Sequence, residues 1–124
     1  MSITFAVLRQ NGLRFDRAPL SPDDSHLSLS NDNAYDVLAA LGIEDSYSSS
    51  PWPIARFRSL LAAARRNRLG RRSPAVATTE HSEPGRMTVI ECGRPEGYVE
   101  QRLKDLSDLV NRGLDAGATL VGWG

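Results

Sequence analysis

The chain has 124 residues, enough for one domain of ordinary size and too few for two. Fifteen basic and fifteen acidic residues give a formal net charge of zero, which excludes an overall electrostatic bias toward nucleic acid. A lone cysteine excludes an intramolecular disulfide, and no run approaches the ~20 apolar residues that a membrane span needs. The N-terminal residues also lack the basic and then apolar pattern of a signal peptide. We therefore expect one soluble, cytoplasmic domain over residues 1–124.

The N-terminal part of the chain predicts a β-hairpin followed by a loop. Apolar residues predominate in 3–8 and 13–15, and Asn11-Gly12 lies between these two runs. Both Asn and Gly tolerate the positive φ angles of a type I′ turn, so this pair is a strong hairpin signal. Residues 16–25 are rich in Pro and Asp and are typical of a loop.

A short helix is predicted next, because apolar residues recur at the spacing of one helical face. Ser30 or Asn31 is the expected N-cap, and Asp32 lies in the first turn. Gly42 is the expected stop. We favour this capping role over the alternative, in which Asn31 and Asn33 bind a ligand. The apolar face consists of Ala34, Val37, Leu38 and Leu41.

A second helix is predicted after Pro51 and Pro53, because prolines are tolerated where the first-turn amides have no partner. Trp52 lies between the two prolines and is expected to anchor the start of this helix. The buried face is expected to consist of Ile54, Phe57, Leu61 and Ala64.

The C-terminal third predicts a strand, a long helix and a second strand. Residues 87–92 form an apolar and β-branched run that suits a strand buried on both faces. Residues 75–79 are expected to pair with it across a turn at 82–85. Residues 119–123 resume β character after Gly117, a natural helix stop. The apolar stripe of the helix consists of Val99, Leu103, Leu106, Val110 and Leu114, with Leu109 broadening it.

These elements predict a single α+β domain with a mixed sheet of about four or five strands and three helices. The helix that follows 87–92 connects two expected strands of one sheet, so the chain should end in a β-α-β unit. Parallel pairing of those two strands would require a right-handed crossover.

Charge is distributed unevenly along the sequence. Residues 16–50 hold seven acids and one basic residue, Arg17, whereas 51–72 hold seven Arg and no acid. The predominance of Arg, with Lys104 as the one Lys, favours a GC-rich bacterial genome over selection for phosphate binding. The candidate interaction residues in the basic run are Arg58, Arg65, Arg66, Arg68, Arg71 and Arg72.

Two interpretations of the basic run are open. Residues 65–72 could bind the phosphates of a nucleic acid, although no aromatic side chains interleave with them for base stacking. Alternatively, this arm packs on the acidic segment 16–45, within the chain or across a dimer, and we favour this interpretation. On a helical wheel Arg58 and Arg65 lie together, whereas Arg56 and Arg66 point elsewhere.

Motifs for common catalytic and metal sites are absent from the sequence. The phosphate-binding pattern G-x-x-x-x-G-K-[ST] and the nucleophile pattern G-x-S-x-G do not occur. Asp23, Asp24 and His26 are close enough to share a metal ion, but a solvated loop is the favoured interpretation. We therefore expect no cofactor and no metal.

The turn at residues 92–96 is the candidate ligand turn. Cys92 ends a predicted strand just before a helix, where the helix dipole would stabilise a thiolate. A cysteine phosphatase loop needs Arg six residues later, and Tyr98 occupies that position. A buried structural cysteine is therefore favoured. Arg94 and Glu96 could bind an anion, but pairing with each other is favoured.

The sequence thus favours a small non-enzymatic protein-interaction module with segregated acidic and basic surfaces, because charge segregation appears without a catalytic constellation. The expected partner is another protein or a second copy of the chain in a homodimer. The first alternative is nucleic-acid binding through residues 65–72. The second alternative is a small enzyme that uses Cys92.

Overall fold

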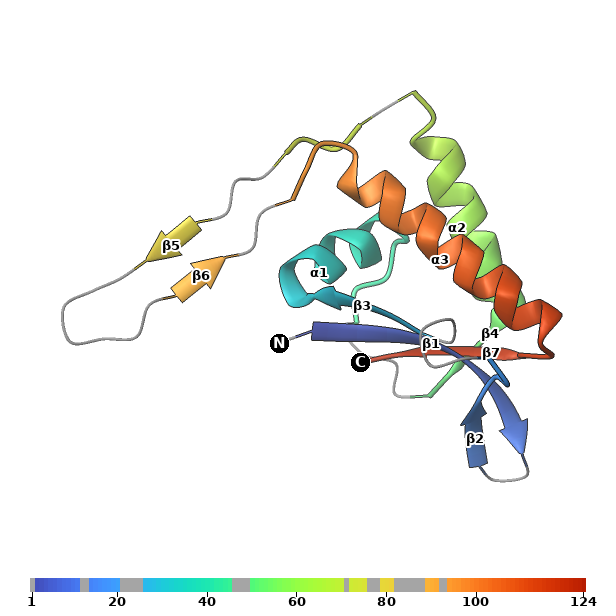
Figure 1. The fold of residues 1–124 in the computed structure, drawn as a ribbon. Coiled ribbons are helices and arrows are strands. Elements are labelled where there is room, and N and C mark those ends of the chain that lie inside the picture. Colours follow the sequence, from blue (N-terminus) through green and yellow to red (C-terminus); the bar gives the residue numbers. More distant parts are fainter. Residues whose placement is uncertain are drawn as a thin grey trace.

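The structure is a computed structural model that describes residues 2–11, 14–20, 26–45, 50–70, 72–75, 79–81, 89–91 and 94–124. These residues form a five-stranded antiparallel sheet with three helices on one of its faces, and a separate two-stranded sheet (Figure 1). In chain order the elements are β1 (Ser2–Asn11), β2 (Arg14–Arg17), β3 (His26–Ser30), α1 (Asn31–Ala40), β4 (Trp52–Pro53), α2 (Ile54–Asn67), β5 (Thr79–His81), β6 (Val89–Glu91), α3 (Tyr98–Asp115) and β7 (Leu120–Trp123).

Strand β1 is the centre of the five-stranded sheet. It pairs with β7 on one side and with β3 and β2 on the other, and β4 pairs with the far side of β7. Side chains alternate between the two faces of a strand. Ile3, Phe5 and Val7 are therefore buried beneath the helices, whereas Thr4 and Ala6 lie half-buried on the opposite face.

The three helices lie side by side over the buried face, with α3 packed against α1 on one flank and α2 on the other (Figure 1). The predicted apolar stripe of α3 is confirmed from Val99 to Val110, but Leu114 is 36% exposed. A second consecutive step of four residues rotates a side chain away from the stripe, so the buried face continues through Gly113 instead.

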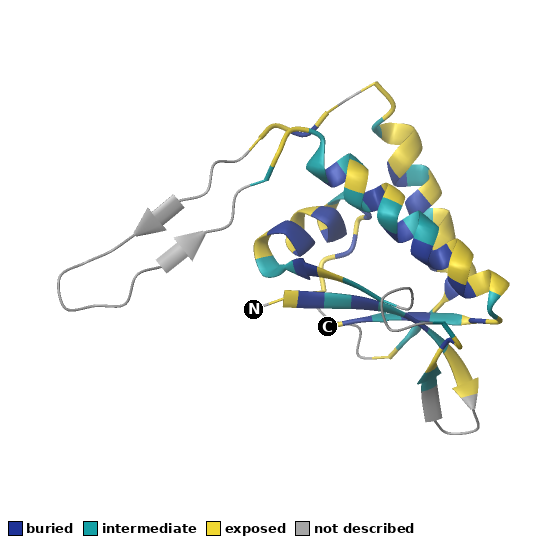
Figure 2. Ribbon diagram, in the orientation of Figure 1, coloured by how far each residue is buried: buried dark blue, intermediate teal, exposed yellow. Residues whose placement is uncertain are grey.

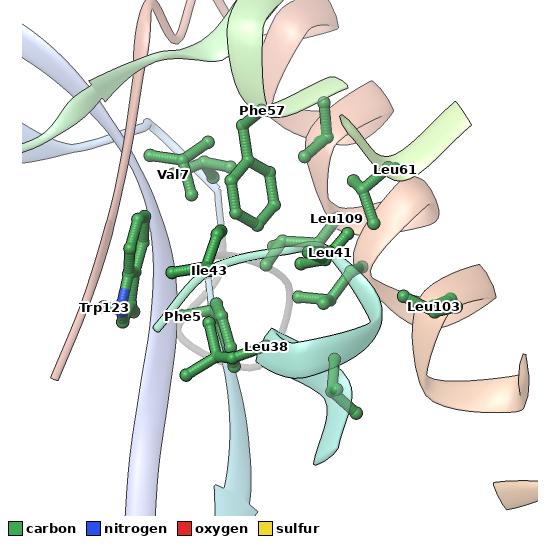
Figure 3. Packing of buried hydrophobic residues seen from close by; sticks show 14 of the residues in the cluster. Phe5, Val7, Leu38, Leu41, Ile43, Phe57, Leu61, Leu103, Leu109 and Trp123 are labelled. Carbon is green, nitrogen blue, oxygen red and sulfur yellow. The ribbon is translucent and has the colours of Figure 1, made fainter. Parts of the chain in front are cut away.

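The buried residues lie where the helices face the sheet (Figure 2). A cluster of aromatic rings, among them Phe5, Phe57 and Trp123, joins the helices to β1 and β7 in this core (Figure 3). The ring of Trp123 lies 6.3 Å from that of Phe5, 5.8 Å from that of Phe57 and 5.1 Å from that of Trp52, centre to centre. The Trp123 indole N–H donates to the Asp45 carbonyl at 3.1 Å. The predicted role of Trp52 at the start of α2 is confirmed by this packing.

The sequence-based fold is confirmed in class and corrected in topology. The α+β class, the three helices and the N-terminal hairpin are present, although the sheet is antiparallel and not mixed. The expected C-terminal β-α-β unit is wrong, because β6 pairs antiparallel with β5 in the separate sheet and not with β7. Strands β3 and β4, which were not predicted, complete the five-stranded sheet.

The predicted boundaries of the helices hold closely. Ser30 is the N-cap position of α1, although its side chain makes no capping hydrogen bond. Gly42 and Gly117 follow α1 and α3 with φ angles of +75° and +86°, which only glycine adopts without strain. No helix in the part of the chain that the structure describes is long and apolar enough to cross a membrane.

Candidate functional site

A groove of about 870 Å³ runs between α2 and α3, and we call it the α2–α3 groove. Its lining includes seven cationic side chains and two carboxylates, Glu96 and Glu100, which is a formal excess of five positive charges. Because the whole chain is formally neutral, this groove is a strong local concentration of positive charge. The cationic side chains are Arg58, Arg65, Arg66, Arg68, Arg72, Arg102 and Lys104.

Five of the six candidate arginines line this groove, and the sixth, Arg71, lies outside the described residues. The expectation that Arg66 points away from Arg58 and Arg65 is wrong, because all three line the groove. Arg56 does point elsewhere, and its guanidinium lies 4.1 Å from the centre of a ring of Trp52. The basic run on α2 therefore separates into groove arginines and one arginine stacked outside the groove.

Ion pairs neutralise only part of this charge. Arg68 of the basic run pairs with Glu100 of α3 and not with a carboxylate of the acidic segment 16–45. In the described parts of the chain, no carboxylate lies within ion-pair distance of the cationic groups of four other groove residues, namely Arg58, Arg65, Arg66 and Arg72. The ion pairs of the groove residues are Arg68–Glu100 at 3.4 Å, Arg102–Asp105 at 3.0 Å and Lys104–Asp108 at 3.8 Å.

Ser73 ties the end of the basic run to the start of α3. Its backbone N–H and its hydroxyl donate to the two carboxylate oxygens of Glu100, at 2.7 and 2.8 Å. The same hydroxyl accepts from the Val99 N–H at 3.2 Å, and the Ser73 carbonyl accepts from the Gly97 N–H at 2.9 Å. Ser73 thus caps α3 from outside the helix, in the manner of a capping box. We call this set of hydrogen bonds the Ser73 node. It links the segment that carries Arg68 and Arg72 to the start of α3.

The same contacts act on the ionisation of Glu100. Burial raises the pKa of the Glu100 carboxyl, but hydrogen bonds from the Ser73 hydroxyl and from backbone N–H groups, with the nearby Arg68, outweigh it. The net effect lowers the pKa below its ordinary value. Glu100 is therefore a carboxylate at neutral pH and holds the node by charge-assisted hydrogen bonds.

A second hollow, of about 430 Å³, adjoins the first and shares Arg68, Arg72 and Glu100 with it. Arg94 also lines this hollow, and its partner is Asp36 of α1 and not Glu96, as expected from the sequence. Glu96 lines the α2–α3 groove instead. The members of the candidate ligand turn therefore face different cavities, and Cys92 lies outside the described residues.

Of the three candidate metal ligands, the structure describes only His26. Asp23 and Asp24 lie outside the described residues, and His26 accepts a hydrogen bond from the Arg17 guanidinium at its Nδ1, 3.3 Å away. Over the described ranges, no three side chains of His, Cys, Asp or Glu gather in a way that could hold a metal ion.

Apolar groups accompany the positive charge of the groove. Leu69 is in its lining, and 78% of its surface is exposed. Tyr98 is half-buried, and the Arg102 guanidinium lies 5.2 Å from its ring centre. The groove can therefore bind a ligand that combines negative charge with apolar surface.

Comparisons with protein-family models, with curated proteins and with solved structures found no match to this chain. The site is consequently argued from its own geometry and charge.

Proposed function

We propose that the protein is a non-catalytic interaction module that binds an acidic segment of a partner protein in the α2–α3 groove. The observation that carries the proposal is the one-sided charge of the groove, whose lining has seven cations against two carboxylates. Complementary potentials accelerate encounter with an acidic partner and suppress binding of basic ones.

The shape of the groove favours a peptide segment. Helices α2 and α3 supply its two sides, and its volume falls within the ~300–1,000 Å³ of typical ligand clefts. Tyr98 and Asn111 of the α3 side are thirteen residues apart within that helix, which corresponds to about 20 Å. A helix of between three and four turns has about this length. An amphipathic helix laid in a groove is a common mode of peptide recognition.

The lining favours protein over nucleic acid. Proteins that bind single strands stack successive bases on aromatic side chains. Among the described residues of the groove, Tyr98 is the one aromatic, and Arg102 already lies against its ring.

Fluorescence anisotropy tests the proposal with a labelled helical peptide that carries carboxylates and leucine on one face. We expect binding at low salt that weakens as salt rises, because the contacts are largely electrostatic. Arg65→Glu should lower the affinity about tenfold or more, since it places like charges together. Arg56→Glu is the matched control, with the same charge change on the same helix outside the groove.

Two results would overturn the proposal. One is the absence of peptide binding even at low salt. The other is an equal loss of affinity in Arg65→Glu and Arg56→Glu, because net charge and not the groove would then be responsible. Tighter binding of a single-stranded oligonucleotide than of the peptide at the same salt would establish the nucleic-acid alternative instead.

A further inference from the structure

Helix α1 carries a surface that complements the α2–α3 groove. Its buried residues face the core, and the opposite side exposes Asp32, Tyr35, Asp36 and Ala39. These positions follow the i, i+3, i+4, i+7 spacing of a single helical face. We call them the α1 stripe. It combines two carboxylates with a tyrosine that is 47% exposed.

The two surfaces match in charge, in apolar content and in length. The stripe carries two negative charges, and the groove has a formal excess of five positive charges. Tyr35 and Leu69 are two of the three large apolar side chains exposed in the described chain, and one lies on each surface. Helix α1 has ten residues, or about 15 Å, and so fits within the ~20 Å over which α3 lines the groove.

The α1 stripe does not reach the groove of its own chain. Helix α3 packs against α1 on one flank and against α2 on the other (Figure 1), and none of the four stripe residues is in the lining of the groove. Asp36 and Ala39 line the smaller adjoining hollow together with Arg68 and Arg72. Asp36 also pairs with Arg94 in its own chain, yet 52% of its side chain is exposed and can accept further hydrogen bonds. Asp32 and Tyr35 line neither hollow and are exposed.

From this match we infer that the occupant of the α2–α3 groove is the α1 stripe of a second copy of the chain. Each copy has both surfaces, so two copies related by a two-fold axis form the contact twice and close the assembly. The inference rests on the proposed function, because it names the acidic segment that the groove binds.

Sedimentation of the full chain over a range of concentrations and salt tests the inference. At low salt the mean mass should rise above that of one chain as concentration increases, and it should fall again at high salt. Arg65→Glu in the groove and Asp32→Arg in the stripe should each weaken self-association about tenfold or more. Arg56→Glu should associate like the wild type.

A mixture of the Arg65→Glu and Asp32→Arg chains provides a complementation test. In a pair with one chain of each kind, the unaltered stripe of the Arg65→Glu chain meets the unaltered groove of the Asp32→Arg chain, so the mixture should associate more tightly than either variant alone. Circular dichroism of each variant establishes that it is folded. An excess of the acidic peptide should also dissociate the wild-type assembly.

A wild-type chain that stays monomeric at high concentration and low salt would overturn the inference, and so would undiminished association of Asp32→Arg. Peptide binding in a strictly monomeric protein would overturn this inference and leave the proposed function in place. Absence of peptide binding together with self-association that ignores both charge reversals would overturn both.

Discussion

Substitution of Gly113 by alanine tests how closely α3 lies on the sheet. A Cβ at this position would meet the Cβ and Cγ1 of Val7 at 2.8 Å and its Cγ2 at 3.1 Å. Two carbon atoms are in favourable contact at about 3.5–4.0 Å, so all three approaches are too short. The Val7 Cβ is fixed to the backbone of the central strand, and no rotamer change moves it away.

Two opposing effects determine the sign of the result. Replacing Gly by Ala inside a helix stabilises it by about 0.8–1.0 kcal/mol. Forcing an extra carbon into a packed core costs about 1–3 kcal/mol, and contact with a backbone-fixed atom places this case in the upper part of that range. We expect a net destabilisation of about 1–2 kcal/mol. For a domain of this size the midpoint of thermal unfolding should fall by about 4 °C per kcal/mol.

Urea unfolding of the wild type, Gly113→Ala, Val7→Ala and the double variant measures the effect as a double-mutant cycle. Val7→Ala alone should cost about 2 kcal/mol, because it leaves a cavity at a fully buried site. In the Gly113→Ala background it should cost about 1 kcal/mol less, because both Cγ atoms that crowd the new Cβ are removed. Stabilisation by Gly113→Ala, or purely additive effects, would refute the close approach.

Four further substitutions probe the hydrogen bonds at Ser73 and the buried stripe of α3. Ser73→Ala removes the acceptor of the Val99 N–H and one donor to Glu100, and it should cost about 1–3 kcal/mol in chemical denaturation. Glu100→Gln should destabilise the fold at neutral pH. The folded state lowers the pKa of the Glu100 carboxyl, so the charged carboxylate stabilises the wild-type fold at pH values above its ordinary pKa of 4.5. This stabilisation is lost as the pH falls through the folded-state pKa. The thermal midpoints of the wild type and Glu100→Gln should therefore converge in acid. Leu106→Ala should cost about 2–5 kcal/mol, whereas Leu114→Ala, at a 36% exposed site, should cost less than about 1 kcal/mol; equal costs would contradict the altered stripe.

Local patterns in the sequence predicted the elements whose signals are local. The long amphipathic period of α3 and the turn signal between the first two strands depend on neighbouring residues, and the helix and the hairpin are both confirmed. Asn11, however, pairs with Arg14 as the last residue of β1 and so is not at the centre of the turn, as the type I′ prediction placed it. Strand β4 is two residues long and includes Pro53, so it has no recognisable strand pattern of its own. Its pairing depends on β7, which lies almost seventy residues away.

The parallel pairing was mispredicted because sequence periodicity gives the type of an element and not its partner. Residues 87–92 have the composition of a buried central strand, yet β6 forms a two-stranded sheet with β5. The groove was predictable only in part for the same reason. The arginines of α2 form a visible run, but Arg102 and Lys104 join them only through the packing of α3 on α2.

The same packing bears on what the groove arginines contribute. Helix α2 is anchored in the core by Phe57 and Leu61, which are almost fully buried. Like charges gathered between two helices repel one another and reduce stability, and neutral polar residues at the positions of Arg58 and Arg65 would avoid this repulsion. The groove lining has a formal excess of five positive charges in a chain of zero net charge, so the rest of the chain has a formal excess of five negative charges. A negatively charged ligand in the groove would offset the repulsion there, which is the physical reason that supports the proposed binding of an acidic segment.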